Sequence, residues 1–227
     1  MDAALADRLA DVDARIVDAA RSAGRDPAEI TRIVVTKFHP VSLITDLYEL
    51  GVRDVGENRQ QELTAKHREV GGLDGLRWHF IGQAQTNKAR AVRAASDAVH
   101  SVDRARIADA LDAADDDSRL DVLLQVNLTD DPGRGGVAPT EVEALATQVA
   151  ALENLRVRGV MAVAPLDEVP ARAFERLRHC ADAVRRVVPD ATWISAGMTG
   201  DFPEAIAMGA THLRIGSAIT GPRPPRD

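Results

Sequence analysis

Cysteine and aromatic residues are scarce in this chain. Its single cysteine, Cys180, excludes an intramolecular disulfide framework and disfavours a zinc site built from cysteines. Aromatic residues make up 3% of the 227 residues, and acidic side chains outnumber basic ones by 35 to 28. Nucleic-acid-binding proteins usually carry a basic excess or a basic face, so this balance argues against a nucleic-acid partner.

Long apolar runs are also missing. No stretch approaches the roughly 18 residues of a membrane-spanning helix, and the chain starts with Met1-Asp2, unlike a signal peptide. These absences predict a cytoplasmic protein without a membrane partner. The composition, 45% hydrophobic and 28% charged, is typical of a folded globular protein. The length fits one or two domains, or one α/β barrel of roughly 200–250 residues.

What is present is an alternation of helical patterns and short apolar runs. The chain begins with a helix that ends near Gly24, and its apolar face comprises Leu5, Leu9, Val12, Ile16 and Ala20. Strands are predicted at 32–36, 52–55, 78–81, 98–101, 121–127, 158–162, 192–195 and 211–215. Helices are predicted between them at 42–50, 59–70, 87–95, 104–114, 139–152, 170–188 and 203–208.

This alternation predicts the α/β class and a (β/α)₈ barrel of the TIM type. We expect one domain over residues 1–227, with the helix of residues 1–24 packing on the barrel. An open, doubly wound parallel sheet is the alternative. The acidic run 115–117 is interpreted as a solvated helix end, and the proline-rich stretch 222–227 as a mobile tail.

Reactive residues of such a barrel follow the carboxyl ends of its strands. Lys37 follows the first strand. Inside the barrel mouth it would be partly desolvated and able to form a Schiff base, but its position alone favours the alternative that it reaches solvent. Asn58, beside Glu57, is interpreted from its spacing as a helix cap, although both residues are also candidates to orient a ligand. His79 lies inside a strand and is expected to be packed and hydrogen-bonded.

The last two loops predict a phosphate site. Residues 195–201 follow the seventh strand and residues 214–218 follow the eighth. Small residues let backbone N–H groups approach an anion, and these two loops often hold a phosphate in barrels of this class. Ordinary turn chemistry is the alternative. The glycine-rich stretch 133–136 lacks the dinucleotide-binding pattern, the histidines lack metal-ligand spacing, and Cys180 shares the apolar face of a helix.

Six motifs occur in one order along the chain: Val35-Thr36-Lys37, Gly56-Glu57-Asn58, and residues 78–82, 85–88, 195–198 and 214–219. With them the chain resembles the pyridoxal phosphate homeostasis proteins, which are similar to the barrel domain of bacterial alanine racemase. The resemblance covers about residues 5–221. The chain departs from the family's usual pattern in its loops, at Arg59, Gln83-Ala84, Ala196 and Thr199.

The resemblance implies that pyridoxal 5′-phosphate (PLP) is the cofactor, and the spacing of the histidines predicts no metal site. It implies that the cofactor site comprises Lys37, Asn58, Ser195, Gly197, Arg214, Gly216 and Ser217. Lys37 would carry PLP as an aldimine, and Ser195 and Ser217 would hold its phosphate. Arg214 would face the pyridine nitrogen, and Asn58 would lie near the ring.

The resemblance also implies a carrier that buffers PLP and delivers it to apo-enzymes, as a monomer or weak dimer, without efficient turnover. A racemase needs an acid/base group on each face of its substrate, and the only tyrosine, Tyr48, falls in a predicted helix. A protonated Arg214 would disfavour protonation of the pyridine nitrogen and weaken the ring as an electron sink. The alternatives are a low-activity amino-acid racemase or lyase, and a phosphate-binding barrel enzyme without PLP.

Overall fold

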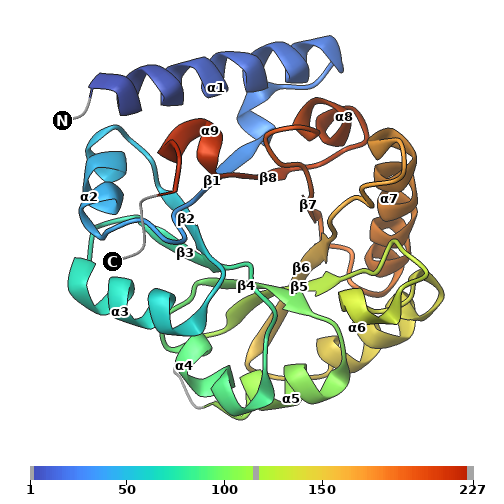
Figure 1. Cartoon of the computed structure of the whole chain (residues 1–227). Coiled ribbons are helices and arrows are strands. Elements are labelled where there is room, and N and C mark those ends of the chain that lie inside the picture. The colour runs from blue at the N-terminus through green and yellow to red at the C-terminus, as the bar shows by residue number, and fades with distance from the viewer. Residues whose placement is uncertain (1–2, 115–117, 224–227) are drawn as a thin grey trace.

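Eight parallel strands close into a barrel in the computed structural model, which describes residues 3–114 and 118–223 (Figure 1). The strands are β1 (Thr31–Val35), β2 (Asp54–Glu57), β3 (Arg77–Phe80), β4 (Ala98–Val102), β5 (Leu120–Gln125), β6 (Leu155–Met161), β7 (Trp193–Ser195) and β8 (His212–Ile215). The barrel closes between β1 and β8, where Thr31 pairs with His212 and Val34 with Ile215. The predicted (β/α)₈ barrel is confirmed, and the open sheet is wrong.

Helices surround the barrel (Figure 1). They are α1 (Ala3–Ser22), α2 (Ser42–Glu49), α3 (Gln60–Val70), α4 (Ala89–Arg93), α5 (Ala105–Asp112), α6 (Val142–Ala150), α7 (Pro170–Val187), α8 (Phe202–Ala207) and α9 (Ser217–Thr220). Short 3₁₀ turns occur at η1 (Pro27–Glu29), η2 (Thr86–Lys88), η3 (Pro132–Arg134) and η4 (Pro139–Glu141).

Two predicted helices are composite. The helices expected at 87–95 and 139–152 each begin as a 3₁₀ turn, η2 and η4, before α4 and α6 start. The helix α9 was not predicted, because four residues are too few to show an apolar period. The acidic run 115–117, the first two residues and residues 224–227 lie outside the described residues.

Helix α1 lies outside the barrel, on the side where β1 meets β8 and the ring closes (Figure 1). Its buried face is the predicted one, Leu5, Leu9, Val12, Ile16 and Ala20. The helix packs against α8 and α9. Arg8 Nε donates to the carbonyl of Ile219 at 2.7 Å, which ties α1 to the short helix that follows β8. The first helix therefore supports the two loops in which a phosphate site was predicted.

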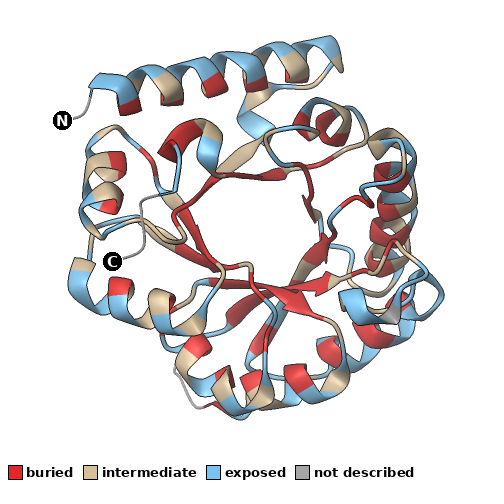
Figure 2. Ribbon diagram, in the orientation of Figure 1, coloured by how far each residue is buried: buried red, intermediate tan, exposed pale blue. Residues whose placement is uncertain are grey.

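The barrel interior contains polar side chains among the apolar ones. The strands are largely buried (Figure 2), because helices cover them from outside and side chains fill them from inside. His100 on β4 contacts Ser195 on β7, and these strands are not neighbours, so the contact crosses the interior. His79, His212 and Arg214 are buried there as well.

Candidate functional site

A cavity of about 480 Å³ opens at the carboxyl ends of the strands. This volume lies in the range of ligand pockets. The cavity brings together Lys37, Asn58, Arg214, Gly216 and Ser217, five of the seven predicted site residues. They come from the ends of β1, β2 and β8, far apart in the sequence.

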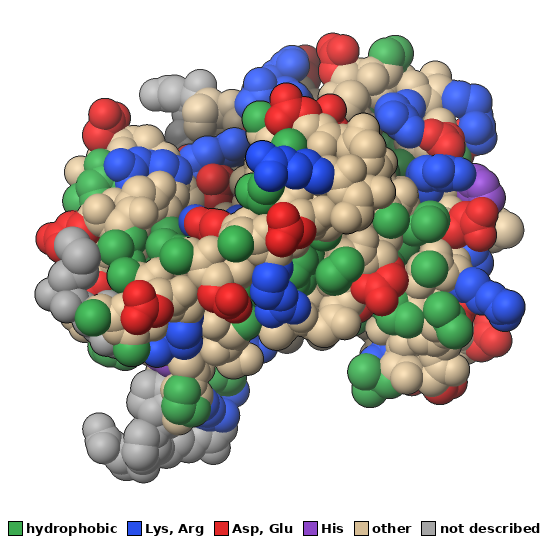
Figure 3. Space-filling model, turned by 90° about the horizontal axis from the view of Figure 1, so that it is seen from above, with side chains coloured by type: hydrophobic (Ala, Val, Ile, Leu, Met, Phe, Trp, Pro, Cys, Tyr) green, Lys and Arg blue, Asp and Glu red, His purple; other side chains and the backbone are tan. Residues whose placement is uncertain are grey.

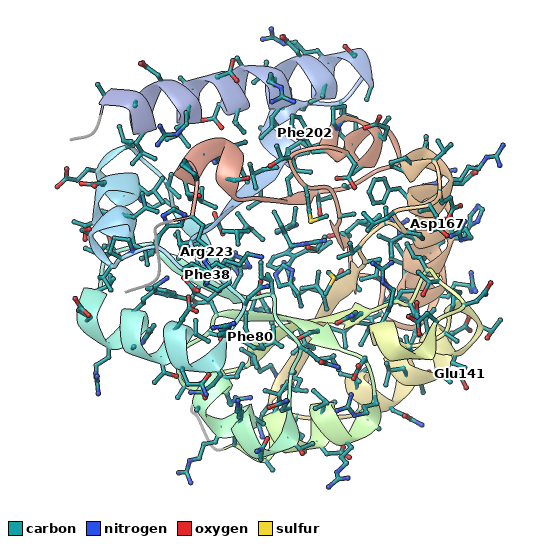
Figure 4. The ribbon with its side chains drawn as sticks, viewed as in Figure 1. Phe38, Phe80, Glu141, Asp167, Phe202 and Arg223 are labelled. Carbon is teal, nitrogen blue, oxygen red and sulfur yellow. The ribbon has the colours of Figure 1, made fainter. Side chains whose placement is uncertain are left out.

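The cavity is basic. Its lining carries the cationic groups of Lys37, Arg214 and Arg223 and, among the described residues, no carboxylate. The guanidinium carbon of Arg223 lies 3.8 Å from the centroid of the Phe38 ring, and the two residues adjoin in Figure 4. Arg59 approaches the same ring at 5.2 Å. Such a lining favours an anionic ligand.

The loop after β1 presents Lys37 to this cavity. Lys37 is half-buried and lines the cavity, which agrees with its inward-facing interpretation. The next residue, Phe38, has a φ of 69°, and no other non-glycine residue within the described ranges has a positive φ. This left-handed backbone is strained in a bulky residue. The Phe38 N–H donates to Glu62 Oε2 at 2.8 Å, which holds the turn in place.

A buried ion pair supports the loop from behind. Lys66 Nζ donates to Glu57 Oε1 at 2.7 Å and to the carbonyl of Thr36 at 2.8 Å. The Thr36 hydroxyl also donates to Glu57 Oε1, at 2.7 Å. Burial raises the pKa of the Glu57 carboxyl, and the nearby Lys66 charge offsets only part of this effect. The role of Lys66 was not predicted, but its spacing from the buried Leu63 on α3 is a signal that it faces inward.

Asn58 does not cap a helix. The N-cap of α3 is Arg59, without a side-chain hydrogen bond, so the capping interpretation of Asn58 is wrong. Asn58 instead lines the cavity. A Cβ atom on Gly82 would lie 1.8 Å from the Asn58 carbonyl oxygen, so the loop after β3 passes too close for any other residue. This approach fixes the backbone that carries Asn58.

Ser195 and Gly197 lie beneath the cavity and do not line it. The fully buried Ser195 hydroxyl lies 2.9 Å from His100 Nδ1 and accepts from Arg214 Nη1 at 2.7 Å. Gly197 has a φ of 93°, and a Cβ there would lie 2.8 Å from the Ala205 Cβ. Gly197 therefore lets the loop pass tightly over α8, and the following residues, 198–200, reach the cavity.

Arg214 is the cation of the cavity floor. Its Nη2 donates to the carbonyl of Ala162 at 2.8 Å, and its Nη1 donates to Ser195. Burial lowers the pKa of Arg214 to about 10, and Asp201 opposes that shift. The guanidinium is therefore still protonated at neutral pH.

Two of the titratable side chains that line the cavity were not predicted. His39 follows Lys37 by two positions, and its pKa is lowered by burial and by the charge of Lys66. Its imidazole is therefore mainly neutral at pH 7. Arg223 lies in the stretch interpreted as a mobile tail, but it stacks on Phe38.

Other predictions can be compared with the structure directly. His79 is buried and hydrogen-bonded, as expected, and Cys180 is buried in the core. In the described part of the chain, no His, Cys, Asp and Glu side chains are grouped to hold a metal ion. Likewise, no helix described is both long and apolar enough to cross a bilayer. On the face shown in Figure 3, acidic and basic side chains are interspersed.

A second cavity, of about 870 Å³, lies beside the loops after β5 and β6. Four carboxylates line it, those of Asp130, Asp131, Asp167 and Glu168, and the last of these pairs with Arg176. It contains none of the predicted site residues. The smaller, basic cavity is therefore the candidate site for an anion.

Comparisons with known proteins agree with this architecture. Residues 15–224 match the family described as alanine racemase, N-terminal domain. The structure of PipY from Synechococcus elongatus PCC7942 with PLP bound is similar, with a TM-score of 0.83 and 34% identity over 96% of this chain and 100% of that one. Alanine racemase from Corynebacterium glutamicum shares the fold at a TM-score of 0.71 and 16% identity, over 95% of this chain and 59% of the racemase. The chain is thus a barrel of the alanine racemase type.

Curated relatives define the family more closely. The pyridoxal phosphate homeostasis protein of Escherichia coli (strain K12) is 40% identical over 230 residues, which cover 96% of this chain and 97% of the relative. The protein of the same name from Pseudomonas aeruginosa is 41% identical, over 96% of each chain. The chain belongs to the family of pyridoxal phosphate homeostasis proteins.

The buried ion pair generates a prediction about stability. Replacing Lys66 with Met leaves the Glu57 carboxylate buried without its cation, which should lower the free energy of unfolding by about 3–5 kcal/mol near neutral pH. The loss of the cation raises the folded-state pKa of Glu57 further. Stability linked to a raised carboxyl pKa is present at low pH and is lost as the pH rises through the folded-state value. Urea unfolding should therefore show a smaller difference in the free energy of unfolding between wild type and Lys66→Met at acidic pH than at neutral pH.

Two controls accompany this measurement. Lys88→Met removes another half-buried lysine and should change stability much less. The double variant Glu57→Gln/Lys66→Met removes both charges and should recover part of the loss. The role assigned to the pair is contradicted if the stability lost by Lys66→Met does not depend on pH. It is also contradicted if the double variant is no more stable than Lys66→Met.

Proposed function

We propose that this protein binds PLP in the basic cavity and acts in PLP homeostasis, holding the cofactor and releasing it to apo-enzymes in the cytoplasm without efficient turnover of its own. The observation that carries the proposal is the placement of Lys37 in a cationic cavity together with Arg214, Gly216 and Ser217. The names of the curated relatives and the PLP-bound PipY structure support the choice of ligand.

Lys37 supplies the covalent link. Its amine attacks the aldehyde carbon of PLP, a C=N bond forms, and water leaves, so that the cofactor is held as a Schiff base. The backbone around Lys37 is fixed by the bonds of Thr36 and Phe38 to the Glu57, Lys66 and Glu62 side chains. This fixed backbone orients the amine toward the cavity and lowers the entropy lost on binding.

The loops after β7 and β8 hold the phosphate. The exposed Ser217 and the backbone of Gly216 line the cavity, and the segment 198–200 lines it from the neighbouring loop. Backbone N–H groups and a hydroxyl are suitable phosphate donors. The Ser195 hydroxyl lies beneath the cavity, bonded to His100 and Arg214, and therefore acts through Arg214 on the ring rather than on the phosphate.

Arg214 and Asn58 face the ring of the cofactor. A protonated guanidinium near the pyridine nitrogen disfavours protonation of that nitrogen, which leaves the ring a weaker electron sink and favours storage over turnover. The hydroxyl of Tyr48 on α2 donates to the carbonyl of Asp74 at 2.9 Å, and Tyr48 does not line the cavity. It therefore supplies no second acid/base group.

The covalent link can be mapped chemically. Borohydride reduction of the PLP-loaded protein, followed by peptide mass spectrometry, should place the phosphopyridoxyl group on Lys37. Only two other lysines are present, Lys66 and Lys88. Lys37→Ala should lose the label, and Lys88→Met should keep it. A label found chiefly on Lys66 or Lys88 rejects the assignment.

The phosphate contact is tested with two ligands. Ser217→Ala removes one charge-assisted hydrogen bond and should weaken PLP binding about ten-fold, because about 1.4 kcal/mol corresponds to one decade in affinity. Binding of unphosphorylated pyridoxal, measured by the same fluorescence titration, should change little. Ser22→Ala, exposed at the end of α1, is the control. Equal weakening of both ligands argues against a phosphate contact.

A second candidate function is slow racemisation of an amino acid. The observation that favours it is the neutral His39 in the same cavity as Lys37, because racemisation requires two acid/base groups. In deuterated water, the PLP-loaded protein should then exchange the α-hydrogen of alanine, and His39→Gln should slow the exchange more than ten-fold. If wild type and variant exchange equally slowly, the racemase function is rejected and storage stands.

A further inference from the structure

Arg214 is the last member of a chain of hydrogen bonds that crosses the barrel. Its Nη1 donates to Ser195 Oγ at 2.7 Å, and Ser195 Oγ lies 2.9 Å from His100 Nδ1. His100 Nε2 lies 3.0 Å from His79 Nδ1, and His79 Nε2 lies 2.8 Å from Asp54 Oδ1. Each of these four distances is that of a hydrogen bond.

The chain of contacts connects the two ends of the barrel. Asp54 is the first residue of β2 and its side chain is 19% exposed, whereas Arg214 lines the cavity beyond the strand ends. The three residues between them, Ser195, His79 and His100, are fully buried, so water does not compete for their hydrogen bonds. They come from β7, β3 and β4.

Donors and acceptors fix the direction of this chain. Arg214 only donates, so Ser195 Oγ accepts from it and uses its own proton toward His100 Nδ1. His100 then carries its proton on Nε2 and donates to His79 Nδ1. His79 in turn carries its proton on Nε2 and donates to Asp54. Every bond has one donor and one acceptor when both rings are neutral and Asp54 is ionised.

The opposite arrangement fails at two places. If His100 donated to Ser195, the serine proton would have no acceptor among the hydrogen bonds described. His79 would then donate to His100, and its unprotonated Nε2 would face the Asp54 carboxylate unless the ring became a cation. A cationic His79 would be paired with Asp54, but the serine proton would still lack an acceptor among the hydrogen bonds described.

The charges around the chain agree with this direction. Burial holds the pKa of His100 well below its ordinary value, so this ring is neutral. Burial by itself raises the pKa of Asp54, but the hydrogen bond from His79 and the charge of Arg77 are among the causes that lower it overall, so this carboxyl is ionised. The neighbouring His212 is outside the chain and bonds to Thr211 Oγ1 at 2.8 Å; burial lowers its pKa to about 3.

We infer that Asp54, His79 and His100 are positioning residues that act through Ser195 on Arg214. The polarised chain turns a serine lone pair toward Nη1, which holds the guanidinium against Ser195 and leaves its other donors for the cavity. A carboxylate at the far end of the barrel thereby orients the cation that faces the ligand. The effect on PLP rests on the function proposed above, whereas the direction of the chain does not.

The direction is tested in the protein without PLP. Long-range ¹H–¹⁵N NMR of the imidazoles distinguishes the two neutral tautomers and the cation. His79 and His100 should both be neutral with the proton on Nε2 near pH 7, and Asp54→Asn should perturb both rings, with no loss of fold in circular dichroism. A proton on Nδ1 of His100, or a cationic His79, overturns the inference.

The positioning effect is tested with PLP. His100→Phe keeps an aromatic ring and breaks the chain, and it should weaken PLP binding about ten-fold, the loss of one well-placed charge-assisted hydrogen bond. Asp54→Asn, which keeps an acceptor and loses the charge, should weaken it about three-fold. His212→Phe, an equally buried change outside the chain, should stay within about two-fold of wild type.

These outcomes separate the two proposals. If wild type does not bind PLP, the proposed function fails, and the chain is judged on the tautomers alone. If wild type binds PLP but Asp54→Asn binds it as tightly, the positioning role is rejected while storage stands. If His100→Phe does not fold, Asp54→Asn and the tautomers of the wild type still decide the matter. If His212→Phe weakens binding as much as His100→Phe, the effect belongs to barrel packing.

Discussion

The burial of the Arg214 cation inside the barrel is the constraint on which the site depends. A buried guanidinium is tolerated only when its donors are occupied. Here Ser195 and the Ala162 carbonyl accept two hydrogen bonds from the guanidinium, and Ser195 is in turn hydrogen-bonded to His100. The barrel therefore contains a polar path from Asp54 to the cavity beside a large apolar core.

A second buried charge supports the neighbouring part of the cavity wall. The Glu57–Lys66 pair lies behind the loop that carries Lys37, and its bonds to Thr36 compensate for the strained backbone of Phe38. Strain of this kind persists only where the surroundings over-determine the conformation. The backbone that carries Lys37 and the guanidinium of Arg214 are thus both held by polar or charged groups beneath the cavity surface.

The sequence predicted the barrel because parallel strands buried on both faces appear as apolar runs. Its errors have identifiable causes. The beginning of β6 was missed because Arg156 alternates with the apolar residues, and it does so to pair with Asp121 on β5. The end of β2 was missed because Glu57 resembles a surface residue until its contact with Lys66 is known. Propensity describes neighbours along the chain and contains no information about such partners.

The sequence predicted only part of the candidate site. Lys37, Arg214 and Ser217 were predicted to lie together because strand ends of a barrel converge on one face, and all three line the same cavity. The Ser195 side chain turns away from the cavity and contacts His100, which is 95 residues away in the sequence. A local sequence pattern does not indicate this contact. Arg223 reaches the cavity by stacking on Phe38, a contact that no local pattern indicates.

The pairing of β1 with β8 joins the first strand of the barrel to the last, with Val34 opposite Ile215. Lys37 lies just beyond one of these strands and Ser217 just beyond the other. These two cavity residues are thus adjacent only after the ring has closed, so a chain with β8 detached has no complete cavity. A ligand that spans this seam binds only the closed ring and stabilises the closure by mass action.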